Sequence, residues 1–359
     1  MCDIRNNAHN SRPGVKTVPL DNALGMVLAH DITEIRAGEF KGRAFKKGHI
    51  IRDEDVRRLR KLGKEHLFVI TISGDEMHED DAAYVLAHAL MGEGVGIAGE
   101  PKEGKINIIA ERDGLLKINK QALTEFNMLG EVMCATLHDN TMVKKGRTVA
   151  GTRAIPLVVK KDIVEGASAV ARASGGVIDV REMRSPKVGV VITGNEVYYG
   201  RTRDAFAPVI TRKVHDVHGE LVGIYFAPDN EEFIAARLNE LIEAGADLLI
   251  TTGGMSVDPD DITRFAVKKL GAGNITYGSA VLPGAMFMIA YLNNSDKLPI
   301  PILGIPACGM YHKTTVFDLV LPRVLAGEII GRKELAELGH GGLCMNCKEC
   351  RYPACSFGK

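Results

Sequence analysis

Two apolar segments in the second half of the chain each end at glycine, and polar residues stand on both sides of these glycines. Residues 187–193 lead into Gly194, Asn195 and Glu196, and residues 248–252 lead into Gly253, Gly254, Met255 and Ser256. Uninterrupted apolar runs are typical of buried parallel strands, and glycine at a strand end lets a ligand approach the backbone closely. The carboxyl ends of parallel strands meet at one edge of a sheet, so the two segments together predict one ligand site.

The polar groups beside these glycines suit a phosphate or a heterocycle. The hydroxyl groups of Thr193 and Thr252 and the amide of Asn195 can form hydrogen bonds, and Glu196 can accept from ligand amines or hold Mg²⁺ through water. Ser256 and the amides of the two glycines at a helix start can cradle a phosphate. An ordinary turn at each strand end is the simpler alternative for either segment taken alone.

An acidic run follows the second segment and contains Asp258, Asp260 and Asp261. One carboxylate is enough to cap a helix. Three carboxylates next to a phosphate require a metal ion or a polar ring donor between them. We therefore expect this run to contribute to ligand binding and not only to capping.

The second half alternates strands and helices, which predicts a three-layer α/β domain with a mostly parallel sheet over residues 186–328. Asp229 to Glu232 resemble a capping box, with the aspartate as the cap. Pro283, Gly284 and Pro306 mark further loops at the same edge. The expected strands are 187–193, 221–226, 247–252, 274–278, 285–292 and 300–304, and the expected helices lie near 208–218, 229–245, 260–270 and 309–327.

The first half predicts α+β modules over residues 15–185 that act as scaffolding, after a disordered leader at 1–14. We expect a strand at 45–51, and helices at 53–62, 80–91 and 162–173. The Asp-Gly pair at 113–114 predicts a hairpin between strands 106–110 and 115–119.

Composition excludes some classes of function. The chain has 359 residues with 45% hydrophobic content, enough for two or three cores. Lys and Arg total 45 and are balanced by 45 Asp and Glu, so no overall charge favours nucleic acid or an anionic membrane. No apolar run reaches about 18 residues. The expectation is a cytoplasmic protein with no nucleic-acid or membrane partner.

Four of the seven cysteines crowd the last sixteen residues. Cys344, Cys347, Cys350 and Cys355 have the spacing C-x₂-C-x₂-C-x₄-C, and short loops of this kind bring thiolates onto one metal centre. The first three match the opening of bacterial ferredoxin motifs, although the last gap is one residue longer. Residues 329–359 therefore predict a small metal-binding tail, and zinc and an iron–sulfur cluster both remain open.

The linear order of these motifs resembles a known family. Thr-Gly-Asn-Glu, Thr-Gly-Gly-Met-Ser-Val, Pro-Gly and Gly-Ile-Pro, followed by a helix containing Phe317 and Pro322, are similar to the molybdopterin-binding domain. Molybdopterin molybdotransferases, gephyrin-type proteins and molybdopterin adenylyltransferases share that domain. Residues 23–31 and 45–49 are more weakly similar to the first module of the molybdotransferases.

The resemblance implies molybdopterin or adenylylated molybdopterin as the ligand, with Mg²⁺ assisting molybdate insertion. It implies catalytic roles for Glu196 and Asp261. It also implies that the chain forms a homodimer and that a molybdoenzyme receives the cofactor. The departures are Asn195 and Asp258, Cys308 in the Ile-Pro loop, and the lack of a first-half Asp-Asn-Ser-Ala-Met-Asp-Gly-Tyr segment. They favour binding over transfer. The alternatives are a non-catalytic carrier, chaperone or sensor that contacts a partner through the cysteine tail, or an enzyme that hydrolyses a nucleotide pyrophosphate or nicotinamide mononucleotide.

Overall fold

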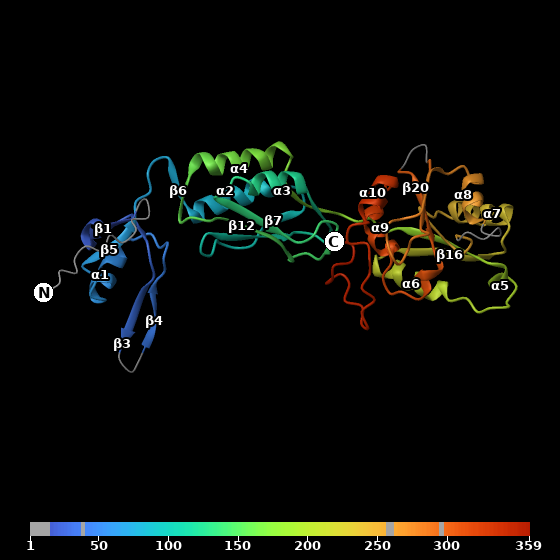
Figure 1. Ribbon diagram of the computed structural model, residues 1–359, viewed down its shortest axis with the longest axis horizontal. Coiled ribbons are helices and arrows are strands. Elements are labelled where there is room, and N and C mark those ends of the chain that lie inside the picture. Colours follow the sequence, from blue (N-terminus) through green and yellow to red (C-terminus); the bar gives the residue numbers. More distant parts are fainter. Residues whose placement is uncertain (1–14, 37–39, 256–261, 294–297) are drawn as a thin grey trace. The chain divides into compact units, whose positions relative to one another are not determined.

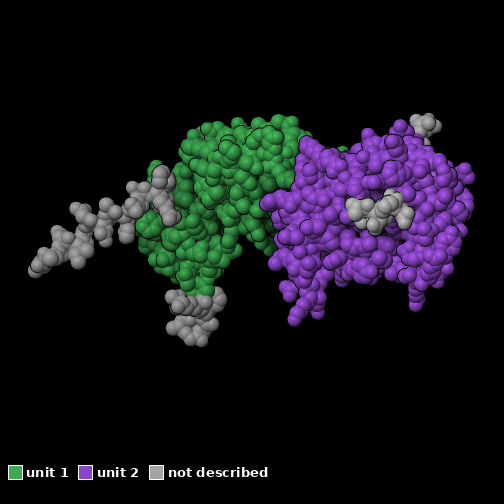
Figure 2. Space-filling view, turned by 45° about the vertical axis from the view of Figure 1, so that its right-hand side comes forward, with its two compact units in different colours: residues 1–111, 118–137, 145–179 green, residues 112–117, 138–144, 180–359 purple. Residues whose placement is uncertain are grey.

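The computed structural model describes residues 15–36, 40–255, 262–293 and 298–359 (Figure 1). Contacts divide the chain into two compact units (Figure 2). One unit contains residues 1–111, 118–137 and 145–179, and the other contains residues 112–117, 138–144 and 180–359. The prediction of separate boundaries at 185 and 328 stays a prediction.

The start of the first unit is a small antiparallel sheet with one helix. Strands β1 (Val15–Pro19), β5 (His66–Ile70) and β2 (Val27–Leu28) form the sheet, and β3 (Ile32–Arg36) pairs with β4 (Phe40–Phe45). Helix α1 (Asp53–Lys61) forms as predicted, and Gly63 follows it in a left-handed conformation. The expected strand at 45–51 is wrong. Gly48 has φ +87° and turns the chain, and Asp31 Oδ1 accepts from the Lys47 amide at 2.7 Å.

The rest of the first unit packs helices against a four-stranded antiparallel sheet of order β10-β12-β8-β7. Helices α2 and α4 confirm the two predicted near 80–91 and 162–173. The elements of this region are β6 (Glu76–His78), α2 (Glu79–Leu90), β7 (Val95–Ile97), β8 (Lys105–Ala110), α3 (Lys120–Asn127), β10 (Val132–Thr136), β12 (Thr148–Ala154), β13 (Val158–Lys160) and α4 (Lys161–Ala173).

The predicted hairpin across Asp113 and Gly114 is wrong, although both strands exist. β9 (Gly114–Ile118) belongs to another sheet, with β11 (Met142–Val143) and β14 (Ile178–Arg181). The amides of Ala110 and Glu111 donate to the carbonyls of Arg147 and Gly94, so the end of β8 has other partners. A local turn signal was overridden by long-range pairing.

The second unit contains a six-stranded mixed sheet of order β16-β15-β17-β20-β19-β18. The first four strands run parallel, and β19 and β18 continue the sheet with antiparallel pairings. The elements are β15 (Lys187–Thr193), α5 (Asn195–Tyr198), α6 (Phe206–Asp216), β16 (Glu220–Ala227), α7 (Glu231–Glu243), β17 (Leu248–Thr252), α8 (Thr263–Lys269), β18 (Gly273–Tyr277), β19 (Met288–Leu292), β20 (Ile300–Ile305), the 3₁₀ turn η2 (Ala307–Met310), α9 (Val316–Leu325) and α10 (Arg332–Glu337). The predicted α/β class and mostly parallel sheet are confirmed.

Successive side chains of the central strands enter two different cores. Val190 packs in a core with α6 and α9, whereas Val191 packs in a core with α7 and α8. The helices accordingly cover both faces of the sheet (Figure 1). Burial on both sides explains why these strands read as continuous apolar runs.

Two helix starts differ from the prediction. The cap of α7 is Asn230, whose side chain accepts from the Phe233 amide at 2.9 Å. Asp229 instead accepts from the Asn195 amide at 2.9 Å. The helix expected at 309–327 begins only at Val316, where Thr315 and Asp318 form a capping box.

The C-terminal tail is fixed to the second unit by backbone and side-chain contacts. The Leu282 amide donates to the Gly342 carbonyl, and the Cys344 amide donates to the Leu282 carbonyl, both at 2.8 Å. Phe357 is buried in the core under α9. Among the residues that the structure describes, no helix is both long and apolar enough to cross a bilayer.

Candidate functional site

The carboxyl ends of β15 and β17 lie side by side. The strands are parallel neighbours, and Ile192 is paired with Thr252. The Thr193 hydroxyl donates to the Thr252 carbonyl at 2.8 Å and lies 3.2 Å from the Thr263 hydroxyl. The two Thr-Gly segments of the sequence therefore meet at one edge, as predicted.

The glycines after β17 allow this close approach. Gly253 has φ +78°, and a Cβ added there would lie 2.3 Å from the Thr193 carbonyl oxygen. A Cβ on Gly254 would lie 2.4 Å from the Thr263 hydroxyl and 3.4 Å from the Thr193 hydroxyl. Both glycines therefore serve the packing of the strand ends, whatever they contribute to a ligand.

A cavity of about 400 Å³ opens at this edge. Three loops supply its wall: the one after β17, the one before β19 and the one after β20. Its described lining residues are mostly apolar, and none of them has a charged side chain. The lining residues are Gly253, Met255, Leu282, Pro283, Gly284, Ala285, Met286, Pro306, Ala307 and Cys308.

Five residues chosen from the sequence are among those in this wall: Gly253, Met255, Pro283, Gly284 and Pro306. Sequence reasoning missed other members, notably Leu282, Ala285 and Met286. The available signal was their position next to the Pro-Gly pair, because exposed apolar residues flanking a turn often border a pocket. Burial raises the pKa of the Cys308 thiol, so this side chain is neutral in the cavity wall.

The other predicted residues lie beside the cavity or outside the described chain. Asn195 and Asp229 form two reciprocal hydrogen bonds. The Asn195 amide donates to Asp229 Oδ2 at 2.9 Å, and the Asp229 amide donates to Asn195 Oδ1 at 3.2 Å. Glu196 is exposed, and its carboxylate folds back to 2.8 Å from where a Cβ on Gly194 would stand. Ser256, Asp258, Asp260 and Asp261 lie outside the described residues.

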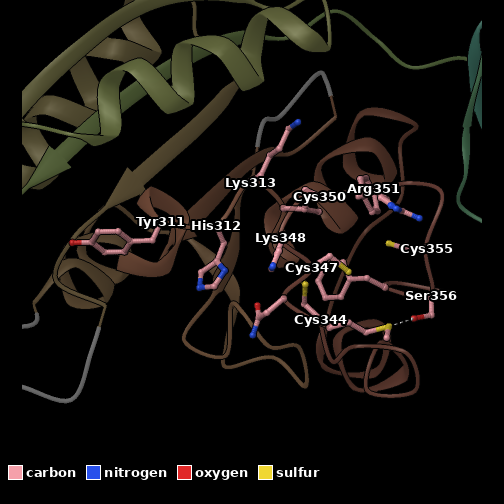
Figure 3. A pocket seen from close by; sticks show the side chains of 15 residues that line it. Tyr311, His312, Lys313, Cys344, Cys347, Lys348, Cys350, Arg351, Cys355 and Ser356 are labelled. Atoms are coloured by element: carbon pink, nitrogen blue, oxygen red, sulfur yellow. Dashed lines mark hydrogen bonds between the residues drawn. The ribbon is translucent and has the colours of Figure 1, made fainter.

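A second cavity, of about 450 Å³, lies in the C-terminal tail (Figure 3). All four tail cysteines line it, together with residues 311–314. Within the described chain, no three His, Cys, Asp or Glu side chains are grouped to hold a single metal ion. The four predicted ligands thus line one space but are not grouped to hold an ion, and the metal site stays a prediction.

Family comparison places the sheet and its cavity in a known class. Residues 189–326 match the family described as "Probable molybdopterin binding domain", and residues 17–71 match one described as "Domain of unknown function (DUF8806)". The C-terminal half therefore contains a domain of the molybdopterin-binding family, which confirms the resemblance seen in the motifs.

The match to each individual relative covers only part of that relative's length. The chain is similar to a molybdopterin molybdenumtransferase of Haemophilus influenzae, with 30% identity over 180 residues that cover 47% of this chain and 41% of that protein. It is similar to a CinA-like protein of Mycobacterium avium, with 31% identity over 136 residues that cover 32% of this chain and 31% of that protein. The chain thus spans less than half the length of either relative.

Two solved structures show weaker likeness. A tungsten cofactor synthesizing protein from Pyrococcus furiosus has 19% identity and a TM-score of 0.33, covering 41% of this chain and 98% of that chain. A molybdopterin biosynthesis protein from Pyrococcus horikosii has 17% identity and a TM-score of 0.31, covering 88% of this chain and 75% of that chain.

Proposed function

We propose that the second unit binds molybdopterin or its adenylylated form in the cavity at the carboxyl ends of β17 and β20. The observation that carries the proposal is the convergence of three loops that the sequence singled out separately. Gly253, Gly284 and Pro306 come from points up to about fifty residues apart, yet they line one cavity in a domain of the molybdopterin-binding family.

The lining suits a flat heterocycle with an anionic side arm. Met255, Leu282 and Met286 offer apolar contact to a ring, and most small-molecule sites combine such walls with a few polar groups. The described lining residues carry no charged side chain, so among the described residues the backbone amides at the glycine-rich strand end are the groups that would bind the phosphate.

Molybdate insertion is a finer proposal for the same site. Mg²⁺ is commonly bound by one or two carboxylates together with substrate phosphates. Among the described residues, Glu196 offers an exposed carboxylate beside β15, which fits part of such a site. When bound, the ion would assist cleavage of the adenylate. Asp261 is proposed as the second carboxylate from the resemblance alone.

A carrier or sensor role uses the same pocket without turnover. Incubation of the full chain with adenylylated molybdopterin, Mg²⁺ and molybdate separates the two. Release of AMP and formation of the molybdenum cofactor support insertion. Binding of the pterin without turnover supports a carrier, chaperone or sensor that delivers the cofactor to a molybdoenzyme.

Filling the cavity tests binding directly. Ala307 is an exposed residue of the cavity wall, so Ala307→Trp blocks the space without entering a core. We expect at least a tenfold weaker affinity for molybdopterin in anaerobic titration. Ala173→Trp, at an exposed position on α4, is the matched control and should bind like the natural chain. Equal affinity in all three proteins would contradict the proposed location.

A further inference from the structure

The cavity in the C-terminal tail has the composition of a metal-cluster site. Cys344, Cys347, Cys350 and Cys355 all line it, although they are spread over twelve residues of chain. Figure 3 labels all four among the side chains that line this space. Four thiols around a single space are what a protein needs to ligate a soft metal centre.

The charge of the lining favours an anionic occupant. Lys313, Lys348 and Arg351 line the cavity, and none of the described lining residues is a carboxylate. A metal centre held by four thiolates carries net negative charge, because four thiolate charges exceed the charge of zinc or of a cubane core. The three cations are placed to compensate that charge.

The spacing of the cysteines favours a cluster over a single ion, because the first three follow the C-x₂-C-x₂-C opening of ferredoxin motifs. Among the described residues, no three Cys, His, Asp or Glu side chains are grouped so that they could hold a metal ion, so ligation of any metal centre requires the sulfurs to move. The four cysteines line one space of about 450 Å³, which leaves room for this rearrangement and for a cluster.

The tail is anchored to the second unit on both sides of the cysteine loop. Phe357 is buried in the core of the second unit, and Tyr352 packs against the same core. The Cys344 amide is bonded to the Leu282 carbonyl, and the Cys350 sulfur lies 3.4 Å from the Thr314 hydroxyl. These contacts hold the cysteine loop against the second unit and keep its four thiols near one space.

From these observations we propose that Cys344, Cys347, Cys350 and Cys355 ligate one [4Fe–4S] cluster. The C-x₂-C-x₂-C opening agrees with the bacterial ferredoxin spacing, and the longer last gap lets Cys355 reach the cluster from the far side of the loop. The proposal is independent of pterin binding, since its residues are distinct from those of the other cavity.

Anaerobic reconstitution of the full chain tests this assignment. The chain is incubated with ferrous iron and sulfide, desalted, and analysed for iron, acid-labile sulfide and zinc. We expect about four iron and four sulfide per chain, a brown colour with broad visible absorption, and an electron paramagnetic resonance signal after reduction by dithionite. One tightly held zinc that excludes iron, or a chain that retains neither metal, would overturn the proposal.

Single substitutions locate the site. Cys347 is exposed, so Cys347→Ser should leave the fold intact by circular dichroism while most of the bound iron and sulfide is lost. Cys134→Ala is the matched control, because burial raises the pKa of that thiol to about 12 and keeps it from acting as a thiolate ligand. Full cluster content in Cys347→Ser, or equal loss in both variants, contradicts ligation by the tail.

Discussion

At the scale of single residues, the strand-end glycines are explained by packing before any ligand is considered. Gly253 stands against the Thr193 carbonyl, whereas Gly245, also at positive φ, has no heavy atom within 4 Å of an added Cβ. The two positions share the backbone strain of an L-residue and differ only in the clash. They therefore form a matched pair for measuring what close approach of β15 and β17 requires.

We expect Gly253→Ala to lose more stability than Gly245→Ala. A left-handed alanine costs about 1–2 kcal/mol at either site, and the clash at Gly253 adds about 1–3 kcal/mol. Urea unfolding of the second-unit transition measures both values. Equal losses of unfolding free energy would show that the ends of β15 and β17 can move apart at little cost. Gly253 would then not be required for their close approach.

Some residues chosen from the sequence lie together in one cavity wall, and these are the ones whose choice rested on backbone geometry. Gly253, Gly284 and Pro306 were identified because glycine and proline mark strand ends. The bond between Asn195 and Asp229 was not foreseen, since it joins loops 34 residues apart and depends on how two helices start. Local patterns carry no signal for such pairs.

At the scale of elements, the apolar runs predicted the sheet well and the local turn signals predicted pairing poorly. β15 and β17 lie where expected because burial on both faces demands continuous apolar sequence. The Asp-Gly signal at 113–114 failed because β8 and β9 each found better partners elsewhere. Strand partners depend on the whole fold, which a short window of sequence does not contain.

The end of α9 is tied to β9 by a half-buried ion cluster. Glu328 Oε1 lies 2.6 Å from Lys117 Nζ, and Glu328 Oε2 accepts from Arg323 Nε at 2.8 Å. Burial by itself would raise the pKa of Glu328, but its contacts with Lys117 and Arg323 outweigh burial and hold the pKa below the usual value. Asp139 lies 3.8 Å from the same lysine, and Glu334 interacts electrostatically with Arg323, so both carboxylates also face the cluster.

This cluster predicts a loss of stability in acid. A lowered carboxyl pKa contributes stability that is complete above the ordinary glutamate pKa of about 4.3 and is lost as the pH falls through the lowered value. Glu328→Gln should therefore be less stable than the natural chain at pH 7, and the difference should shrink below about pH 4. Glu337→Gln is the control because that side chain is 62% exposed. Thermal unfolding over a pH series measures both, and a constant difference for Glu328→Gln would contradict the assignment.

At the scale of the whole molecule, the sequence predicted which half contains the domain of the molybdopterin-binding family but not how the tail joins it. The cysteine spacing indicated metal chemistry, because thiolate spacing alone defines such motifs. The anchoring of the tail by Phe357 and by the backbone of Leu282 follows from tertiary packing and has no sequence signature. The homodimer and the recipient molybdoenzyme stay predictions.

The central claim is that the loops after β17 and β20 and the loop before β19 together hold a phosphorylated pterin. A crystal structure of the full chain grown anaerobically with molybdopterin tests it most directly. We predict ligand density bordered by Gly253, Pro283 and Pro306, with the phosphate on backbone amides at the glycine-rich edge. A well-ordered structure in which this cavity is empty, or in which the pterin binds elsewhere, would contradict the account.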